Sequence, residues 1–237
     1  ALVIGNGDYQ SLVKLRNPLN DARDMAAALR SIGFDVELLI DADRASMEEV
    51  SVRFGQRLST STDAIGLLFF AGHGVQSNGR NYLIPASASI PSESYLPDRS
   101  VSAQVILDEM QRAGNALNIV ILDACRDNPF GWARSGSARG LSVVSNQPPG
   151  SIIVYATSAG SIALDGEGEN GVFTSELLRH IKTPGIDVSE VFRRTGKGVR
   201  DTTNGKQVPA VYSQFFDTAY LATAPTTLES TAPPSAT

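Results

Sequence analysis

Short apolar runs alternate along the chain with longer segments in which apolar residues recur every three or four positions. The runs are typical of strands covered on both faces, and the longer segments are typical of amphipathic helices. The predicted strands are 1–5, 34–40, 64–71, 81–85, 117–122 and 151–155, and the predicted helices are 19–32, 43–58, 102–113, 172–182 and 188–199. This alternation predicts an α/β fold with a mainly parallel sheet of about six strands and helices on both faces.

Two stretches depart from this alternation. Residues 127–150 are rich in Gly, Ser, Pro and Arg, and so long a loop in a compact domain usually has a function. Residues 223–237 are dominated by Pro, Thr, Ser and Ala, a composition typical of a disordered linker. We therefore expect one domain, residues 1–222, followed by a tail.

The composition excludes several classes of function. A formal net charge of −5 argues against a nucleic-acid-binding surface, and no apolar run is long enough to span a membrane. The single cysteine excludes a disulfide scaffold and a Cys-rich zinc site. The compartment stays open, because the chain starts at Ala1 inside an apolar run and we expect any signal segment to lie outside it.

Residues that could do chemistry follow two of the predicted strands. His73 comes just after residues 64–71, and Cys125 comes just after residues 117–122. Sites in parallel α/β sheets form outside the carboxyl ends of the strands, so the two side chains are expected to face one crevice. An imidazole beside a thiol can accept its proton and leave a nucleophilic thiolate. Either residue alone is usually structural, and their joint placement carries the hypothesis of a catalytic pair.

The neighbours of this pair fit the same hypothesis. Glycines flank His73 and would let the backbone approach a substrate closely. The amide groups of Gly74 and Cys125 are predicted to form an oxyanion hole. The other histidine, His180, falls near the end of a predicted helix, where a cationic group is favourable, so a structural role is expected for it.

At this point the chain resembles the caspase fold family over nearly all of residues 1–222. The resemblance rests on four motifs in order: LNDA at 19–22, GHG at 72–74, DACRD at 123–127 and YATSAG at 155–160. The histidine stands about 50 residues before the cysteine, a spacing noted for caspases. The resemblance implies a caspase-like fold, a cysteine endopeptidase that uses His73 and Cys125, and a substrate cleft lined by Ala156, Thr157 and Ser158.

Within this family the chain is most similar to metacaspases and paracaspases, in their bacterial (orthocaspase-like) branch. Caspases bind an Asp side chain before the cut bond through two arginines and a glutamine; the matching positions here are Leu15, Asp165 and Asp123. Asp21 matches a pocket acid of metacaspases. The resemblance thus implies an acidic pocket of Asp21, Asp123 and Asp165. Such a pocket prefers Arg, then Lys, and rejects Asp. In the alternative interpretation, Asp21 solvates the first helix and Asp165 is a turn residue.

Three further expectations come from the resemblance. Metacaspases commonly bind calcium through an acid a few residues past the cysteine, but residues 128–132 hold none, so no metal or other cofactor is expected. Metacaspase-like relatives tend to be monomers, and a monomer that acts on peptides or proteins with basic residues is expected here. Arg126, Arg134 and Arg139 are candidates for self-cleavage, unless they only solubilise a surface loop.

Two other interpretations stay open. The chain could be a caspase-like interaction module without activity, although both residues of the pair and the flanking glycines are present. Gly5-Asn6-Gly7 after the first predicted strand could belong to a nucleotide-binding domain, but the third glycine of that motif is missing.

Overall fold

A computed structural model of the chain describes residues 1–125, 130, 141, 147–158 and 168–223; at Cys125 the description covers the backbone. Its central sheet has the strand order β2-β1-β3-β6-β7-β8. The first five of these strands are parallel, and β8 is antiparallel to β7. The strands are β1 (Leu2–Gly5), β2 (Glu37–Ile40), β3 (Ile65–Ser77), β6 (Leu117–Cys125), β7 (Ser151–Tyr155) and β8 (Ala210–Ser213).

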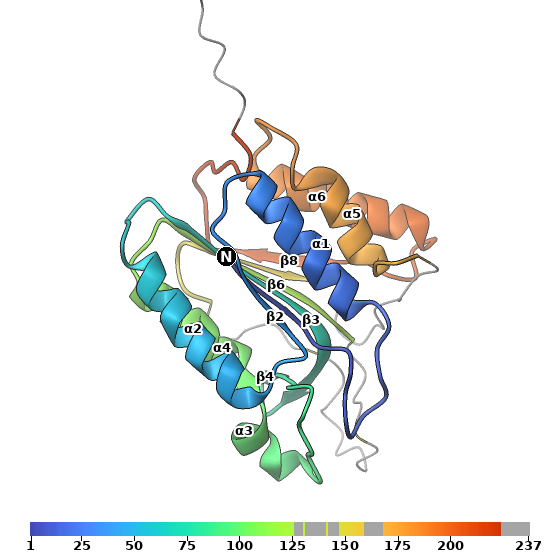
Figure 1. The fold of residues 1–237 in the computed structure, drawn as a ribbon. Coiled ribbons are helices and arrows are strands. Elements are labelled where there is room, and N and C mark those ends of the chain that lie inside the picture. Colours follow the sequence, from blue (N-terminus) through green and yellow to red (C-terminus); the bar gives the residue numbers. More distant parts are fainter. Residues whose placement is uncertain (126–129, 131–140, 142–146, 159–167, 224–237) are drawn as a thin grey trace, which may run out of the picture.

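Helices cover both faces of this sheet (Figure 1), which confirms the predicted α/β fold. One face carries α1 (Pro18–Ser31), α5 (Val172–His180) and α6 (Val188–Thr202). The opposite face carries α2 (Arg44–Leu58) and α4 (Ala103–Arg112). Because both faces are covered, the sheet separates two apolar cores, and the inner strands are almost wholly buried.

The helices form where the sequence pattern predicts them. In α1 the buried apolar side chains include Ala22, Met25, Ala26 and Leu29, which lie on one side of the helix because they recur every three or four positions. In α2 the Asp43 carboxylate accepts the N–H of Ser46 at 2.8 Å and so caps the helix as expected.

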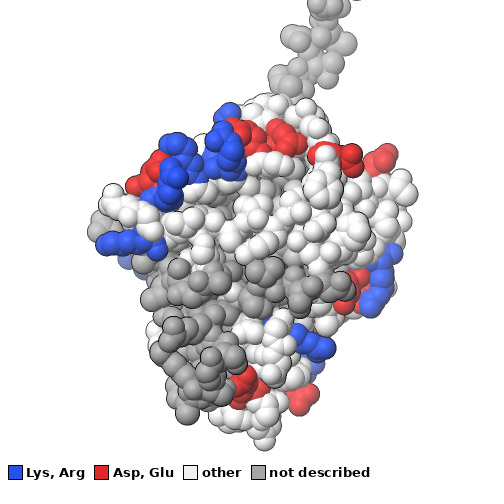
Figure 2. All heavy atoms as spheres, turned by 180° about the vertical axis from the view of Figure 1, so that it is seen from behind, with Lys and Arg blue, Asp and Glu red and all other residues white. Residues whose placement is uncertain are grey.

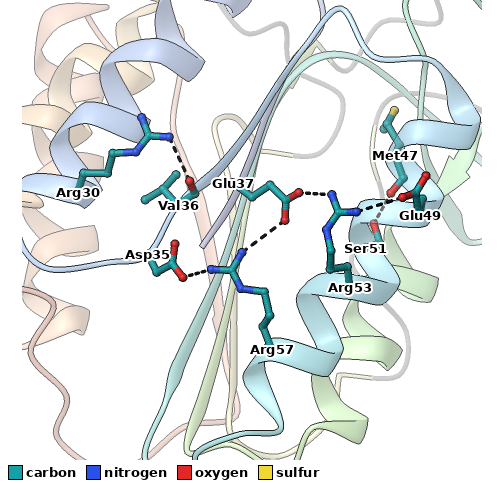
Figure 3. Close-up of polar contacts among 9 residues, drawn as sticks. All are labelled: Arg30, Asp35, Val36, Glu37, Met47, Glu49, Ser51, Arg53 and Arg57. Atoms are coloured by element: carbon teal, nitrogen blue, oxygen red, sulfur yellow. Dashed lines mark hydrogen bonds and ion pairs between the residues drawn. The ribbon is translucent and has the colours of Figure 1, made fainter.

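Ion pairs attach α2 to the edge strand β2 (Figure 3). Arg53 pairs with Glu37 of β2 and also with Glu49 one turn earlier in its own helix. Arg57 pairs with Glu37 and with Asp35, just before the strand. Basic side chains elsewhere also lie beside acidic ones. Figure 2 shows the molecule from behind, and along the upper edge of this view Lys and Arg lie among Asp and Glu. Several such ion pairs lie on α6.

Two of the predicted strands were placed too short, and two short strands, Val101–Ser102 and Ala210–Ser213, were missed. β3 runs on to Ser77 because β4 (Arg80–Leu83) folds back and pairs with its last residues; β5 (Val101–Ser102) then pairs with β4. β6 runs on to Cys125 because its ladder with β3 continues to that point. β8 escaped prediction because it is short and only half-buried. The short helix α3 (Leu96–Arg99), which follows a 3₁₀ turn at Glu93–Tyr95, was also not predicted.

Candidate active site

The parallel ladder between β3 and β6 ends with His73 opposite Cys125. Their Cα atoms are register partners, as are those of Ala71 and Asp123 two positions earlier. The prediction that both residues follow the strands was wrong, because both lie inside the extended ends of their strands. The backbone nevertheless brings the two predicted catalytic residues to adjacent positions on neighbouring strands.

His73 is held by a main-chain acceptor. Its side chain is buried, with 6% of the residue exposed, and Nε2 lies 2.8 Å from the carbonyl oxygen of Val13. A carbonyl oxygen can only accept a hydrogen bond, so Nε2 must carry the proton in this contact. In the neutral ring Nδ1 is then the basic nitrogen. The loop that contains Val13 thus fixes which nitrogen of His73 can take up a proton.

Tyr9 fixes the backbone and the ring of the same histidine. The His73 N–H donates to the Tyr9 hydroxyl at 2.7 Å, and that hydroxyl donates to the carbonyl of Ile84 at 3.2 Å. The rings of Tyr9 and His73 are tilted by 50°, with centroids 4.5 Å apart. Tyr9 is fully buried, so these contacts are shielded from water and His73 is restrained from two sides.

Close packing against the protein itself leaves little room for a side chain at the two glycines around His73. A Cβ at Gly72, where φ is +155°, would lie 2.6 Å from the Tyr9 hydroxyl and 3.0 Å from the carbonyl oxygen of Asn6. A Cβ at Gly74 would lie 3.1 Å from Ala124 on β6 and 3.1 Å from Leu141. Small residues here allow β3, β6 and the 6–9 loop to approach one another.

Two of the three predicted pocket acids converge on the start of α5. Asp21, buried in the first turn of α1, accepts the Gly171 N–H at 2.9 Å through Oδ1. Asp123, half-buried on β6, accepts the Thr174 hydroxyl at 2.6 Å through Oδ2. Asp21 therefore does more than solvate its own helix, because its carboxylate joins segments 150 residues apart in the chain.

Side-chain amides reinforce the junction between α1 and the segment before α5. Asn20 donates to the carbonyl of Glu169 at 3.1 Å, and Asn170 donates to the Asp24 carboxylate at 3.0 Å. Sequence reasoning missed these residues, and it also missed Thr174, Tyr9 and the Val13 carbonyl.

The predicted cleft segment continues from β7. The Ala156 N–H donates to the carbonyl of Leu122 at 3.0 Å, and the Ala156 carbonyl accepts the side chain of Gln207 at 2.8 Å. Thr157 is fully buried, and the Ser158 hydroxyl donates to the carbonyl of Val208 at 2.8 Å. These hydrogen bonds hold residues 156–158 between β6 and residues 207–208.

Among the described residues, one further predicted candidate lies away from these acids. His180 lies in the last turn of α5, at the end of the helix opposite the acids. Asp165, Arg126, Arg134 and Arg139 lie outside the described residues. In the described part of the chain, no cluster of three or more His, Cys, Asp or Glu could hold a metal ion, and no helix is long and apolar enough to cross a membrane.

Comparison with known proteins supplies the context for this geometry. The family model described as "Caspase domain" matches residues 1–220. The chain is 30% identical over 219 residues to human mucosa-associated lymphoid tissue lymphoma translocation protein 1, and 34% identical to the mouse homolog over the same length. Each alignment covers 90% of this chain and 25% of the relative, so the chain spans about a quarter of the length of these proteins.

Proposed function

Because the chain belongs to the caspase domain family, we propose that it is a cysteine endopeptidase that uses His73 and Cys125 and cuts after basic residues, Arg before Lys. One observation carries the catalytic part of the proposal. The β3–β6 register makes His73 and Cys125 Cα partners, while the Val13 carbonyl holds the proton on Nε2 of the histidine. Nucleophilic catalysis by cysteine needs a base that can take up the thiol proton, and the register brings the backbone of such a base beside that of Cys125.

The proposed reaction uses these groups in sequence. Nδ1 of His73 takes the proton of the Cys125 thiol, and the thiolate attacks the carbonyl carbon of the peptide bond. The amides of Gly74 and Cys125 donate to the resulting oxyanion. The imidazolium then protonates the leaving amine as the C–N bond breaks, which leaves a thioester. Water, deprotonated by the same imidazole, hydrolyses the thioester and restores the thiol.

The substrate preference is proposed from the acids at the start of α5. Asp21 and Asp123 come from different elements, and the same short turn holds both carboxylates. Hydrogen bonds to charged groups contribute about 1.5–3 kcal/mol each, and an unpaired buried carboxylate is costly. We therefore expect Arg to be preferred over a neutral residue by on the order of a hundredfold. An Asp side chain would be repelled.

The test is a panel of fluorogenic peptides that differ only in the residue before the cut bond: Arg, Lys, Asp or Asn. The variants Cys125→Ala and His73→Ala are compared with His180→Ala, a histidine at the far end of α5. We expect cleavage after Arg and Lys that both dyad variants abolish and His180→Ala leaves intact. Cleavage after Asp would refute the basic specificity. No cleavage by folded protein would favour an interaction module instead.

Several finer features belong to the same proposal. They are the orthocaspase-like branch, activity without calcium, self-cleavage after Arg126, Arg134 or Arg139, and a monomeric state. The last three are tested in turn by the peptide panel with and without calcium, by intact mass after incubation and by sedimentation of the active protein. An unchanged mass in fully active protein would rule out self-cleavage as a requirement.

A further inference from the structure

Both main-chain groups of His73 are tied to one neighbouring peptide unit. The N–H of Ile84, the residue after β4, donates to the His73 carbonyl at 3.0 Å. The His73 N–H donates to the Tyr9 hydroxyl at 2.7 Å, and that hydroxyl donates to the Ile84 carbonyl at 3.2 Å. These three buried residues therefore form a closed ring of hydrogen bonds, in which the position of Ile84 sets the position of the His73 backbone.

Asn6 is a second donor to the Ile84 carbonyl. It is fully buried directly after β1, and its Nδ2 donates to that carbonyl at 3.0 Å. Its Oδ1 accepts the Ala42 N–H at 2.9 Å, and its own N–H donates to the carbonyl of Ala71 on β3 at 2.9 Å. Asn6 thus joins β3, two residues before His73, to the segments that follow β2 and β4.

An amide side chain suits this junction. It carries an acceptor oxygen and a donor nitrogen on one carbon, so it can bind a main-chain N–H and a main-chain carbonyl at once. Nδ2 also lies 3.7 Å from the sulfur of Met47, a weak acceptor. Ala42 is buried as well, and a buried N–H that lost its acceptor would be costly. The chemistry of Asn6 therefore matches a joining role.

We propose that Asn6 is a positioning residue for catalysis, which holds the His73 backbone beside Cys125 by fixing the carbonyl of Ile84. This inference rests on the proposed function, because it concerns the base of the catalytic pair. Asn6 takes no part in bond breaking and acts through Ile84 and Tyr9. A misplacement of about 1 Å in a catalytic group can slow a reaction about a hundredfold, so the hold on this backbone should be read in kcat.

Asn6→Asp separates this role from a merely structural one. The ionised side chain keeps an acceptor for Ala42 but has no donor for Ile84. We expect kcat for an Arg peptide to fall roughly ten- to hundredfold, while KM and the preference for Arg over Lys change little, because the change acts on the base and not on the substrate pocket. The pH profile of Cys125 alkylation should shift in the same direction as in His73→Ala. A merely structural residue would lower stability and leave these properties of the folded enzyme unchanged.

The experiment measures kcat and KM with Arg and Lys peptides, Cys125 alkylation by iodoacetamide across pH, and unfolding in urea. Asn118→Asp is the matched control, since Asn118 is also a buried asparagine and its Oδ1 accepts the side chain of Asn115 at 3.0 Å. It lies near the start of β6, at the other end of the strand from Cys125. Asn6→Ala, which adds no charge, is a second variant at the site. We expect the loss of kcat in both Asn6 variants and not in the control.

Folded Asn6 variants with the kcat and alkylation profile of an active wild type would overturn the inference and leave the proposed function intact. An equal loss of kcat in Asn118→Asp would do the same. If neither Asn6 variant folds, hydrogen exchange of the wild type replaces them: the amides of His73, Ile84 and Ala42 should open as one unit, and faster exchange at Ala42 would overturn the inference. A wild type that cleaves no peptide, and whose Cys125 alkylation does not depend on His73, would overturn both.

Discussion

The restraint that Tyr9 places on His73 can be removed without creating a cavity. Tyr9→Phe keeps the buried ring but deletes the hydroxyl that the His73 N–H donates to at 2.7 Å. The Ile84 carbonyl loses its 3.2 Å bond from Tyr9 but keeps the Asn6 side-chain amide at 3.0 Å. The variant therefore leaves one main-chain donor, the His73 N–H, without its acceptor in a buried site.

The expected loss follows from that single donor. A buried unsatisfied N–H costs about 1–3 kcal/mol, so the free energy of unfolding should fall by about this amount. In a chain of this size, each kcal/mol lowers Tm by roughly 2–4 °C. Cleavage of the Arg peptide should also slow, because the backbone that carries His73 is less restrained.

Urea unfolding followed by fluorescence and circular dichroism measures this loss. Tyr95→Phe is the control, because Tyr95 is 43% exposed and the variant keeps the ring that faces Arg99. The control should lie within about 0.5 kcal/mol of the wild type. If Tyr9→Phe is as stable as Tyr95→Phe, the Tyr9 hydroxyl does not support His73 and the reasoning fails.

Other variants test the packing and electrostatics of the same fold. In Gly72→Ala the free energy of unfolding should fall by about 1–3 kcal/mol, because the new Cβ would lie 2.6 Å from a buried hydroxyl. A variant as stable as the wild type would contradict this. In α6, the new methyl group of Gly196→Ala would meet open space, so the free energy of unfolding should rise by about 0.5–1 kcal/mol. The methyl group of Gly198→Ala would collide with a buried carboxylate, so the free energy of unfolding should fall. Equal effects of the two variants would be inconsistent with the packing. Burial opposes the charge of Asp187, but N–H donors at the start of α6 and in the C-terminal segment outweigh it and hold its pKa below the usual 3.8. Asp187→Ala should therefore lower the free energy of unfolding at pH 7, and this difference from the wild type should vanish as the pH falls below about 4. A difference that is constant between pH 7 and 3 would exclude this role.

The sequence predicted the layers of the fold because apolar periodicity reports burial directly. It ended β3 and β6 too early, since their last residues are held by partners that periodicity does not reveal, such as β4 folding back on β3. It missed β8 because a short, half-buried edge strand has too few apolar residues to form a pattern.

In the candidate site, too, the sequence pointed to some of the residues and not to others. His73 and Cys125 stood out because few side chains have their chemistry, and a family resemblance pointed to Asp21 and Asp123. The groups that orient them carried no comparable signal. Val13 acts through a backbone carbonyl, which every residue possesses, and Thr174 is one of many threonines until the fold brings its hydroxyl to Asp123.

The most direct test of the central claim is the pH dependence of Cys125 alkylation by iodoacetamide. The chain has one cysteine, so intact mass reports this residue alone and no substrate needs to be known. A thiol paired with His73 should react as a thiolate with an apparent pKa well below the ordinary value of about 8.5, and His73→Ala should move it back toward that value. Coincident profiles for wild type and His73→Ala, both near 8.5, would contradict the catalytic pair.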